Sequence, residues 1–193
     1  MHQTLLINQR YIVWMYSGIK KKKGTSVMSF RLDEDIIEAL REEAEEEEVS
    51  LNVLANHVFR RYVEWERFAQ KAGFIPVTRE LLTALLNEIS DKKIEEIVRK
   101  VGKEVIKAQI LYMQNKYDLD SFIKWSEARN RISGFAQKHV VDSNTHEYII
   151  QHDLNLKWSL YMKTMYEMVL NDVYKKKVEF ELTPSTVVFK LER

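Results

Sequence analysis

The chain has 193 residues and a formal net charge of +1, so its overall charge gives no indication of nucleic-acid binding. Apolar residues make up 45% and charged residues 31%, a balance typical of a soluble folded protein rather than a disordered one. The absence of cysteine excludes disulfides, thiolate metal sites and a cysteine nucleophile, and it fits a cytoplasmic protein.

The first 24 residues contain an apolar run, residues 11–19, that is too short to cross a membrane. The segment also lacks the basic start and the cleavage site of a signal peptide, so we expect no membrane partner. Four consecutive lysines close it, and we interpret residues 1–24 as a flexible basic N-terminal arm. These lysines are Lys20, Lys21, Lys22 and Lys23. In isolation such a run is a solubilising charge cluster.

Residues 25–68 have the pattern of one strand followed by two helices. Residues 27–32 alternate between apolar side chains on one side and Val27, Ser29 and Arg31 on the other. Asp33 and Ser50 are each placed to cap a helix with an apolar stripe. The first of these helices is strongly acidic, with ten acidic residues and one arginine between positions 33 and 48. Such a helix would repel DNA and must therefore face away from it.

One strand and two helices do not form a complete domain, because the strand leaves both edges unpaired and the apolar core is small. A dimer in which two copies of residues 27–32 pair antiparallel removes this problem. The apolar side of the resulting ribbon then covers four helices. The other side presents Val27, Ser29 and Arg31 twice, with the width of a ribbon that fits a DNA major groove.

The segments MSFRLDEDIIEAL and VSLNVLANHVFRRYVE, separated by a short break, resemble the ribbon-helix-helix DNA-binding proteins of the CopG, Arc and MetJ type. The resemblance covers about a quarter of the chain. It implies base reading by Val27, Ser29 and Arg31. It also implies phosphate contacts at Ser50 and Asn52, through backbone N–H groups at the start of the second helix. Beside such a strand, the four lysines are predicted to contact phosphate as well.

The sequence GFIPVT, residues 73–78, is the best domain boundary. Gly73 is placed to end the second helix, and Pro76 prevents its continuation. Residues 25–72 are therefore expected to form the dimerisation and DNA-binding domain, and residues 73–193 a second domain. The second domain begins with predicted helices over residues 79–89, 91–111 and 119–132. The middle helix is expected to carry apolar residues spaced three or four apart: Ile94, Ile97, Val98, Val101, Val105, Ala108 and Leu111.

The hydrophobic period changes after residue 133. Residues 135–141, 145–153, 178–182 and 187–191 alternate as strands do, and Asn155 caps a helix between the second and third of them. The order strand, strand, helix, strand, strand predicts an α+β unit with the helix covering one face of a sheet. Because this helix is apolar nearly all round, it needs cover on a second side, from the preceding helices or from a partner subunit.

Aromatic and methionine side chains on that last helix are usually core residues, but they can also line a pocket for a small-molecule effector. The candidate pocket residues are Trp158, Tyr161, Met162, Met165 and Tyr166. No metal site is predicted, since His146 and His152 lie about 20 Å apart at strand rise, and His139 with His146 lacks a third ligand. No catalytic motif is found, and neither an enzyme activity nor a cofactor is expected.

We predict a sequence-specific DNA-binding transcriptional regulator of the α+β class. Its N-terminal ribbon-helix-helix half forms a homodimer on double-stranded DNA. Its C-terminal half joins dimers into a higher homo-oligomer or senses a small molecule. The alternative is an antitoxin-like module, or another interaction protein, whose C-terminal half binds a protein partner.

Overall fold

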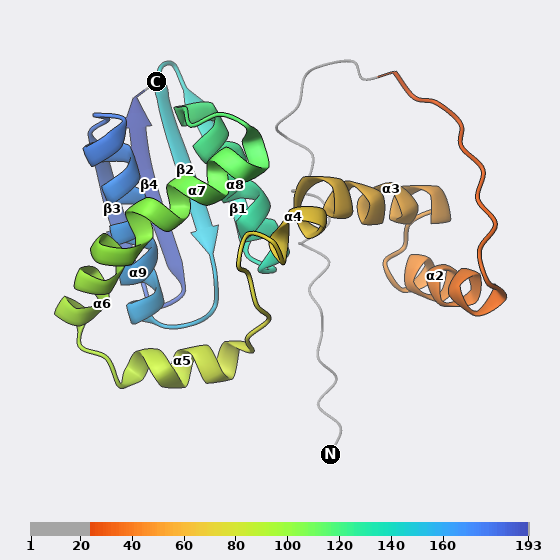
Figure 1. Cartoon of the computed structure of the whole chain (residues 1–193), viewed down its shortest axis with the longest axis horizontal. Coiled ribbons are helices and arrows are strands. Elements are labelled where there is room, and N and C mark those ends of the chain that lie inside the picture. The colour runs from red at the N-terminus through yellow and green to blue at the C-terminus, as the bar shows by residue number, and fades with distance from the viewer. Residues whose placement is uncertain (1–23, 193) are drawn as a thin grey trace. The chain divides into compact units, whose positions relative to one another are not determined.

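The computed structural model describes residues 24–192 and divides the chain into two compact units, one ending at Val63 and the other beginning at Glu64 (Figure 1). This division falls within the predicted second helix, before the expected boundary at Gly73. The reason is that Trp65 is buried and packs against Phe74 with tilted rings, whose centroids are 4.7 Å apart. The helix therefore contributes its last turns to the second unit.

The first unit contains two helices, α2 (Glu34–Glu46) and α3 (Leu51–Arg61), which pack against each other. Ser50 caps α3 as predicted, accepting a hydrogen bond from the Val53 amide at 3.3 Å. Asp33 precedes α2 but makes no side-chain capping bond. A short π-helical stretch, η2 (Tyr62–Glu66), and a short helix, α4 (Arg67–Ala69), continue the chain from α3.

The turn between α2 and α3 places Glu48 in the left-handed region, with φ 54°. The Val49 amide donates to the Ala44 carbonyl at 2.9 Å and the Glu48 amide donates to the Glu45 carbonyl at 3.1 Å. This pair of bonds defines a Schellman motif, which usually takes glycine at the left-handed position. Gly73 and Gly134 occupy the same position in two other helix ends of this chain, with φ of 83° and 67°.

Replacing Glu48 with glycine should therefore raise the free energy of unfolding by up to about 1 kcal/mol, because it removes the steric cost of a side chain in the left-handed region. Glu45→Gly, inside α2, is the matched control. This change should lower the free energy of unfolding by about 1 kcal/mol. Urea unfolding at one fixed protein concentration measures both. A destabilised Glu48→Gly variant would contradict this account of the turn.

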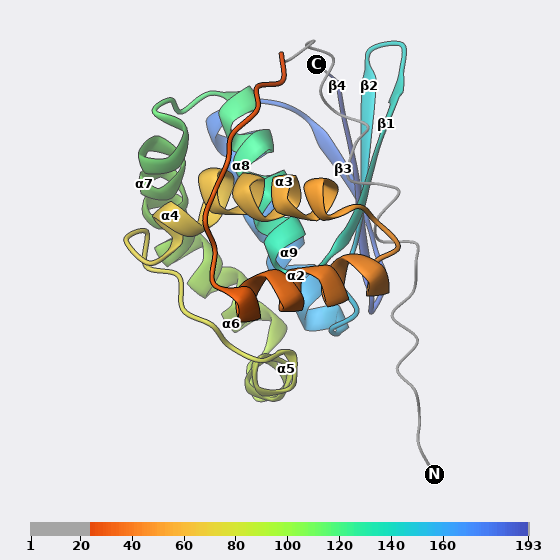
Figure 2. The same ribbon diagram turned by 90° about the vertical axis from the view of Figure 1, so that its right-hand side faces the viewer.

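The second unit has three layers (Figures 1 and 2). A four-stranded antiparallel sheet is covered on one face by α8 (Leu119–Ile132) and α9 (Leu156–Glu167). Outside them lies a continuous helical rod made of α6 (Asp91–Ile97), the π-helical η3 (Val98–Gly102) and α7 (Lys103–Gln114). The preceding helices thus supply the second cover that α9 was predicted to need.

The remaining elements are α5 (Arg79–Asn87), which precedes the rod, and the π-helical η4 (Met168–Val173), which extends α9. Capping residues at the predicted positions fix where α5, α6, α8 and α9 begin. Thr78, Ser90, Asp118 and Asn155 each accept a hydrogen bond from the amide three residues later.

The sheet has the strand order β1-β2-β4-β3, with β1 (Ala136–Asp142), β2 (Thr145–Gln151), β3 (Val178–Leu182) and β4 (Thr186–Glu192). This confirms the predicted α+β class with paired strands on either side of the last helix. The register places Tyr148 opposite Phe189, and their rings stack with centroids 4.8 Å apart. Tyr166 of α9 contacts the same Phe189 ring, which joins the sheet to the inner helices.

The rod confirms the predicted middle helix, but its apolar residues do not all lie on one face. Ile94 and Val98 are buried, but Ile97, Val101 and Val105 are exposed. In the single chain, α8 and α9 cover only one side of the rod, whose buried residues continue with Ile106, Ile110 and Met113. The apolar residues of the rod therefore form two neighbouring rows, of which one is buried and the other is exposed in the described part of the chain.

Candidate functional site

Residues 24–33 have no regular secondary structure, so the predicted strand over residues 27–32 is not formed within a single chain. The physical reason is that a strand requires the backbone of a neighbour, and no described segment pairs with these residues. The predicted base-reading residues Val27, Ser29 and Arg31 are all exposed on this segment. The two-chain ribbon itself stays a prediction.

The side of this segment predicted to face the helices does contact one of them. The ring of Phe30 stacks on that of Phe59 in α3, with centroids 5.2 Å apart. Phe30 is nevertheless 56% exposed, and Met28 and Leu32 are also exposed.

The first unit buries little of its apolar surface. Among its described residues only Ala44 and Leu54 are buried. Its exposed large apolar residues come from the extended segment and from both helices: Val27, Met28, Phe30, Leu32, Ile36, Leu51, Val53, Val58, Phe59, Tyr62 and Val63. A unit with so small a core is not stable alone and requires a covering surface.

The predicted phosphate-binding residues Ser50 and Asn52 lie at the exposed N-terminus of α3. The Ser50 side chain already accepts from the Val53 amide, and the Asn52 carbonyl accepts from the Asn56 side chain at 2.8 Å. Arg31 has no ion-pair partner within residues 24–192, so its guanidinium is available for an outside acceptor. The four lysines of the predicted basic arm lie outside the described residues.

The predicted pocket residues all lie on α9, one of the two inner helices that cover the sheet. Met162, Met165 and Tyr166 are fully buried, while Trp158 and Tyr161 are half-buried and stack with ring centroids 4.6 Å apart. Met165 and Tyr166 also contact residues of α8. In this structure the group is part of the core.

Sequence analysis did not identify Arg129, a buried arginine of α8 that contacts this group. Its guanidinium lies 5.8 Å from the Tyr161 ring centroid and 5.4 Å from that of Trp125. One terminal nitrogen, Nη1, donates to the sulfur of Met165 at 2.7 Å, and the other, Nη2, is buried without an acceptor. Within the described residues it has no carboxylate partner. Arg129 follows Phe122 and Trp125 at helical spacing. The sequence alone could therefore have shown that this charge lies on the apolar face of the helix.

The indole N–H groups of Trp125 and Trp158 are also buried without an acceptor among the described atoms. Arg129 contacts the rings of Trp125 and Tyr161, and Trp158 stacks on Tyr161, so these residues belong to one packed cluster in which three donors have no described acceptor. Leaving such groups unpaired costs about 1–3 kcal/mol each, and more for a charged group.

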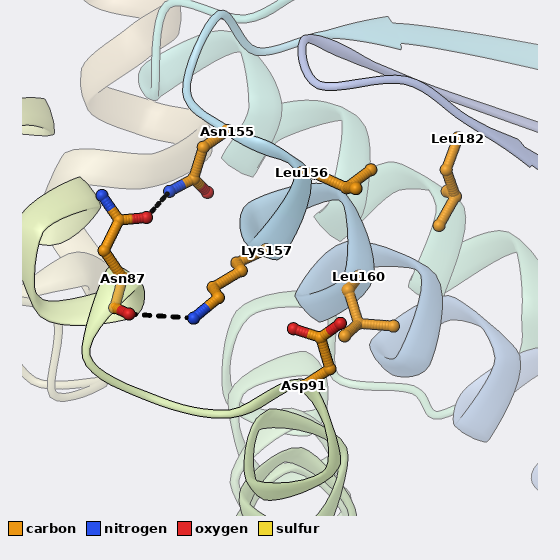
Figure 3. Close-up of a pocket in the computed structure, with 7 residues that line it drawn as sticks. All are labelled: Asn87, Asp91, Asn155, Leu156, Lys157, Leu160 and Leu182. Atoms are coloured by element: carbon orange, nitrogen blue, oxygen red, sulfur yellow. Dashed lines mark hydrogen bonds between the residues drawn. The ribbon is translucent and has the colours of Figure 1, made fainter.

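A hollow of about 480 Å³ lies elsewhere on the second unit, where α5 and α6 meet the start of α9 (Figure 3). The Lys157 ammonium donates to the Asn87 carbonyl at 2.9 Å, and the Asn155 side-chain amide donates to Asn87 Oδ1 at 3.0 Å. The bond from Lys157 gives a partner to a carbonyl group at the C-terminal end of α5, and both bonds link α5 to α9. The other lining residues are Asp91, Leu156, Leu160 and Leu182, so the hollow contains none of the predicted pocket residues.

His139 and His146 approach diagonally across β1 and β2, as predicted. Nε2 of His139 lies 2.8 Å from Nδ1 of His146, and the His139 ring stacks on Tyr148 with centroids 4.2 Å apart. Among residues 24–192 no three His, Asp or Glu side chains are grouped so that they could hold a metal ion. One imidazole must donate its proton to the other, so the pair is a cross-strand hydrogen bond.

His152 is fully buried at the end of β2. Its Nδ1 accepts from the Leu154 amide at 3.1 Å, which requires the proton on Nε2, 2.8 Å from the Ser159 hydroxyl. Burial lowers the pKa of His152 from 6.5 to about 4; the nearby Asp153 charge opposes the shift and the Arg79 charge adds to it. His152 is therefore a neutral structural residue at physiological pH.

Across the described part of the chain, no helix combines the length and the apolar character needed to cross a membrane. No protein-family model matches the chain, and no curated protein sequence matches it.

Proposed function

We propose that this protein is a sequence-specific DNA-binding regulator that acts as a dimer of its first unit. The observation that carries the proposal is the exposed apolar side of residues 27–32, continued by the exposed apolar residues of α2 and α3. A second copy of the same unit fits this surface, because two extended segments can pair antiparallel and satisfy each other's backbone groups. Their polar sides then present Ser29 and Arg31 twice.

The charge distribution of the first unit supports the same orientation. Its acidic residues are concentrated between positions 33 and 48, mainly on α2, while Arg31 and the four lysines precede them. A ribbon in the major groove would place Arg31 at base edges and direct most of α2 away from DNA. The N-terminus of α3 offers backbone N–H groups and a partial positive charge to a phosphate.

Replacing Arg31 with alanine should lower the ratio of specific to random-sequence DNA binding roughly tenfold or more, because a bidentate contact to guanine contributes about 1–3 kcal/mol. Replacing Lys20, Lys21, Lys22 and Lys23 with alanine should weaken binding to all sequences alike and flatten the salt dependence. Gel-shift titrations over a salt series measure both effects. A change of sequence preference in the lysine variant, with none in Arg31→Ala, would reverse the two assigned roles.

The cluster around Arg129 favours a second function, the binding of a small anionic effector such as a carboxylate. A buried cation without a counter-charge destabilises the free protein, and a bound carboxylate would supply both the charge and the missing acceptors.

Replacing Arg129 with methionine should therefore raise the free energy of unfolding of the ligand-free protein by about 1–4 kcal/mol. Arg129→Lys is the control that keeps the charge. Thermal unfolding with and without millimolar succinate measures both parts of the proposal: the carboxylate should stabilise the wild type and leave Arg129→Met unchanged. Reduced stability of Arg129→Met, with no succinate effect on the wild type, would identify Arg129 as a core residue stabilised by its aromatic neighbours.

A further inference from the structure

An uncovered apolar row runs along the rod formed by α6, η3 and α7. We call Ile97, Val101 and Val105 the outer stripe; these side chains are 42%, 53% and 44% exposed. They follow one another at intervals of four residues, which places them on one side of a helix. Single exposed apolar residues are common, but a regular row beside a buried one is typical of a helix that packs on two sides.

The charged residues beside the outer stripe indicate what covers it. Glu96, Lys100 and Glu104 are exposed and follow the same spacing, so their charges alternate along one margin of the stripe. Glu96 forms an exposed ion pair with Lys93 at 2.9 Å. Lys100 and Glu104 have no ion-pair partner within residues 24–192. This margin therefore carries the Lys100 ammonium and the Glu104 carboxylate four residues apart, together with the exposed Lys103 and Lys107.

Two copies of this margin are complementary to each other in one orientation. When two identical helices pair antiparallel about a two-fold axis, equivalent margins meet with their residue order reversed. A register centred near Gly102 then places Lys100 of each copy opposite Glu104 of the other, so that two ion pairs form. A parallel pairing about a two-fold axis would place the two equivalent margins on opposite sides of the interface, so Lys100 and Glu104 of the two copies would not meet.

We propose that the outer stripe is a second homodimer interface, formed by antiparallel packing of the rod against the rod of another copy. It uses a different unit of the chain from the extended segment, so it does not depend on the proposed pairing of the first unit. With both interfaces present, the second unit would fix how DNA-binding dimers are joined. The avidity gained in this way favours DNA with repeated sites.

Sedimentation velocity of four full-length proteins at micromolar concentration tests the proposal. These are the wild type, Phe30→Asp to disrupt the first unit's pairing, Val101→Glu to disrupt the stripe, and the double variant. Phe30→Asp should remain a dimer and the double variant should be a monomer. Val101 is 53% exposed, so its replacement should leave the helical circular-dichroism signal unchanged.

A monomeric Phe30→Asp protein would overturn the proposal, since it would mean that the outer stripe forms no interface between copies. The failure of the proposed first-unit dimer has a different outcome. In that case Val101→Glu alone would already be a monomer while Phe30→Asp remained a dimer.

Charge reversal tests the orientation. In the Phe30→Asp protein, Lys100→Glu or Glu104→Lys should each weaken dimerisation about threefold to tenfold, and both together should restore it. Glu179→Lys, on the exposed side of β3, is the control and should have no effect. A double variant as weak as either single variant would overturn the antiparallel register.

Discussion

Phe30→Asp should abolish specific DNA binding, with a loss of affinity of at least roughly a hundredfold, since a carboxylate buried without a partner costs several kcal/mol. In the proposed dimer Phe30 lies beneath the ribbon, where it already contacts Phe59 within one chain. An aspartate there would be buried among apolar residues of both copies, so the copies should separate. Each single segment would then lack the pairing that shapes it as a strand.

Ser29→Asp is the matched control, because Ser29 lies on the opposite side of the same segment. It should weaken DNA binding by repelling phosphate but leave the first-unit dimer intact. Both variants can be compared by gel shift, and in the Val101→Glu protein by sedimentation, where only first-unit pairing remains. If Phe30→Asp keeps full DNA affinity, the proposed ribbon is not the DNA-binding element.

The second unit should lose stability as the pH falls from 6.5 towards 4, because His152 must remain neutral in the folded protein. Its pKa is lowered to about 4 by burial, while the unfolded chain binds the proton near the ordinary value of 6.5. The stabilisation is therefore fully present above pH 6.5 and decreases as the pH falls through this window. The contribution of neutral His152 to the free energy of unfolding is on the order of 3 kcal/mol, since each unit of pKa difference corresponds to about 1.4 kcal/mol.

His152→Gln separates this titration from the protonation of carboxylates. At pH 7 the variant should be less stable than the wild type, because the bonds to Leu154 and Ser159 are disturbed. The difference between the two proteins should shrink towards pH 4. His57→Gln, in α3, has the same number of histidines as His152→Gln and is the control for the loss of one histidine. A His152→Gln difference that stays constant with pH would rule out the buried neutral histidine as the cause.

Local signals predicted the second unit well. Each of Thr78, Asp118 and Asn155 caps the helix that follows it, since a side-chain oxygen placed before an apolar helix can satisfy a free amide. The strict alternation around Phe180 and Phe189 predicted strands β3 and β4, because the side-chain period of a strand differs from that of a helix.

Signals that depend on distant contacts could not be read from the sequence. Helical spacing grouped Ile94 with Ile97, but only α8 and α9 determine which of the two is covered. Similarly, an arginine side chain is usually exposed, and only the packing of α8 against α9 buries Arg129 against Met165. No segment among the described residues pairs with residues 27–32, so the strand predicted there would need the backbone of a second chain.

Selection of binding sites from a pool of random duplex DNA tests the central claim most directly, using the full-length wild-type protein at physiological salt. Two antiparallel copies of residues 27–32 are related by a two-fold axis, so the enriched sequences should be palindromic or nearly so. They should contain a guanine in each half that is no longer selected by Arg31→Ala. Failure to enrich any sequence, or an unchanged preference in Arg31→Ala, would contradict the proposal that paired extended segments read DNA.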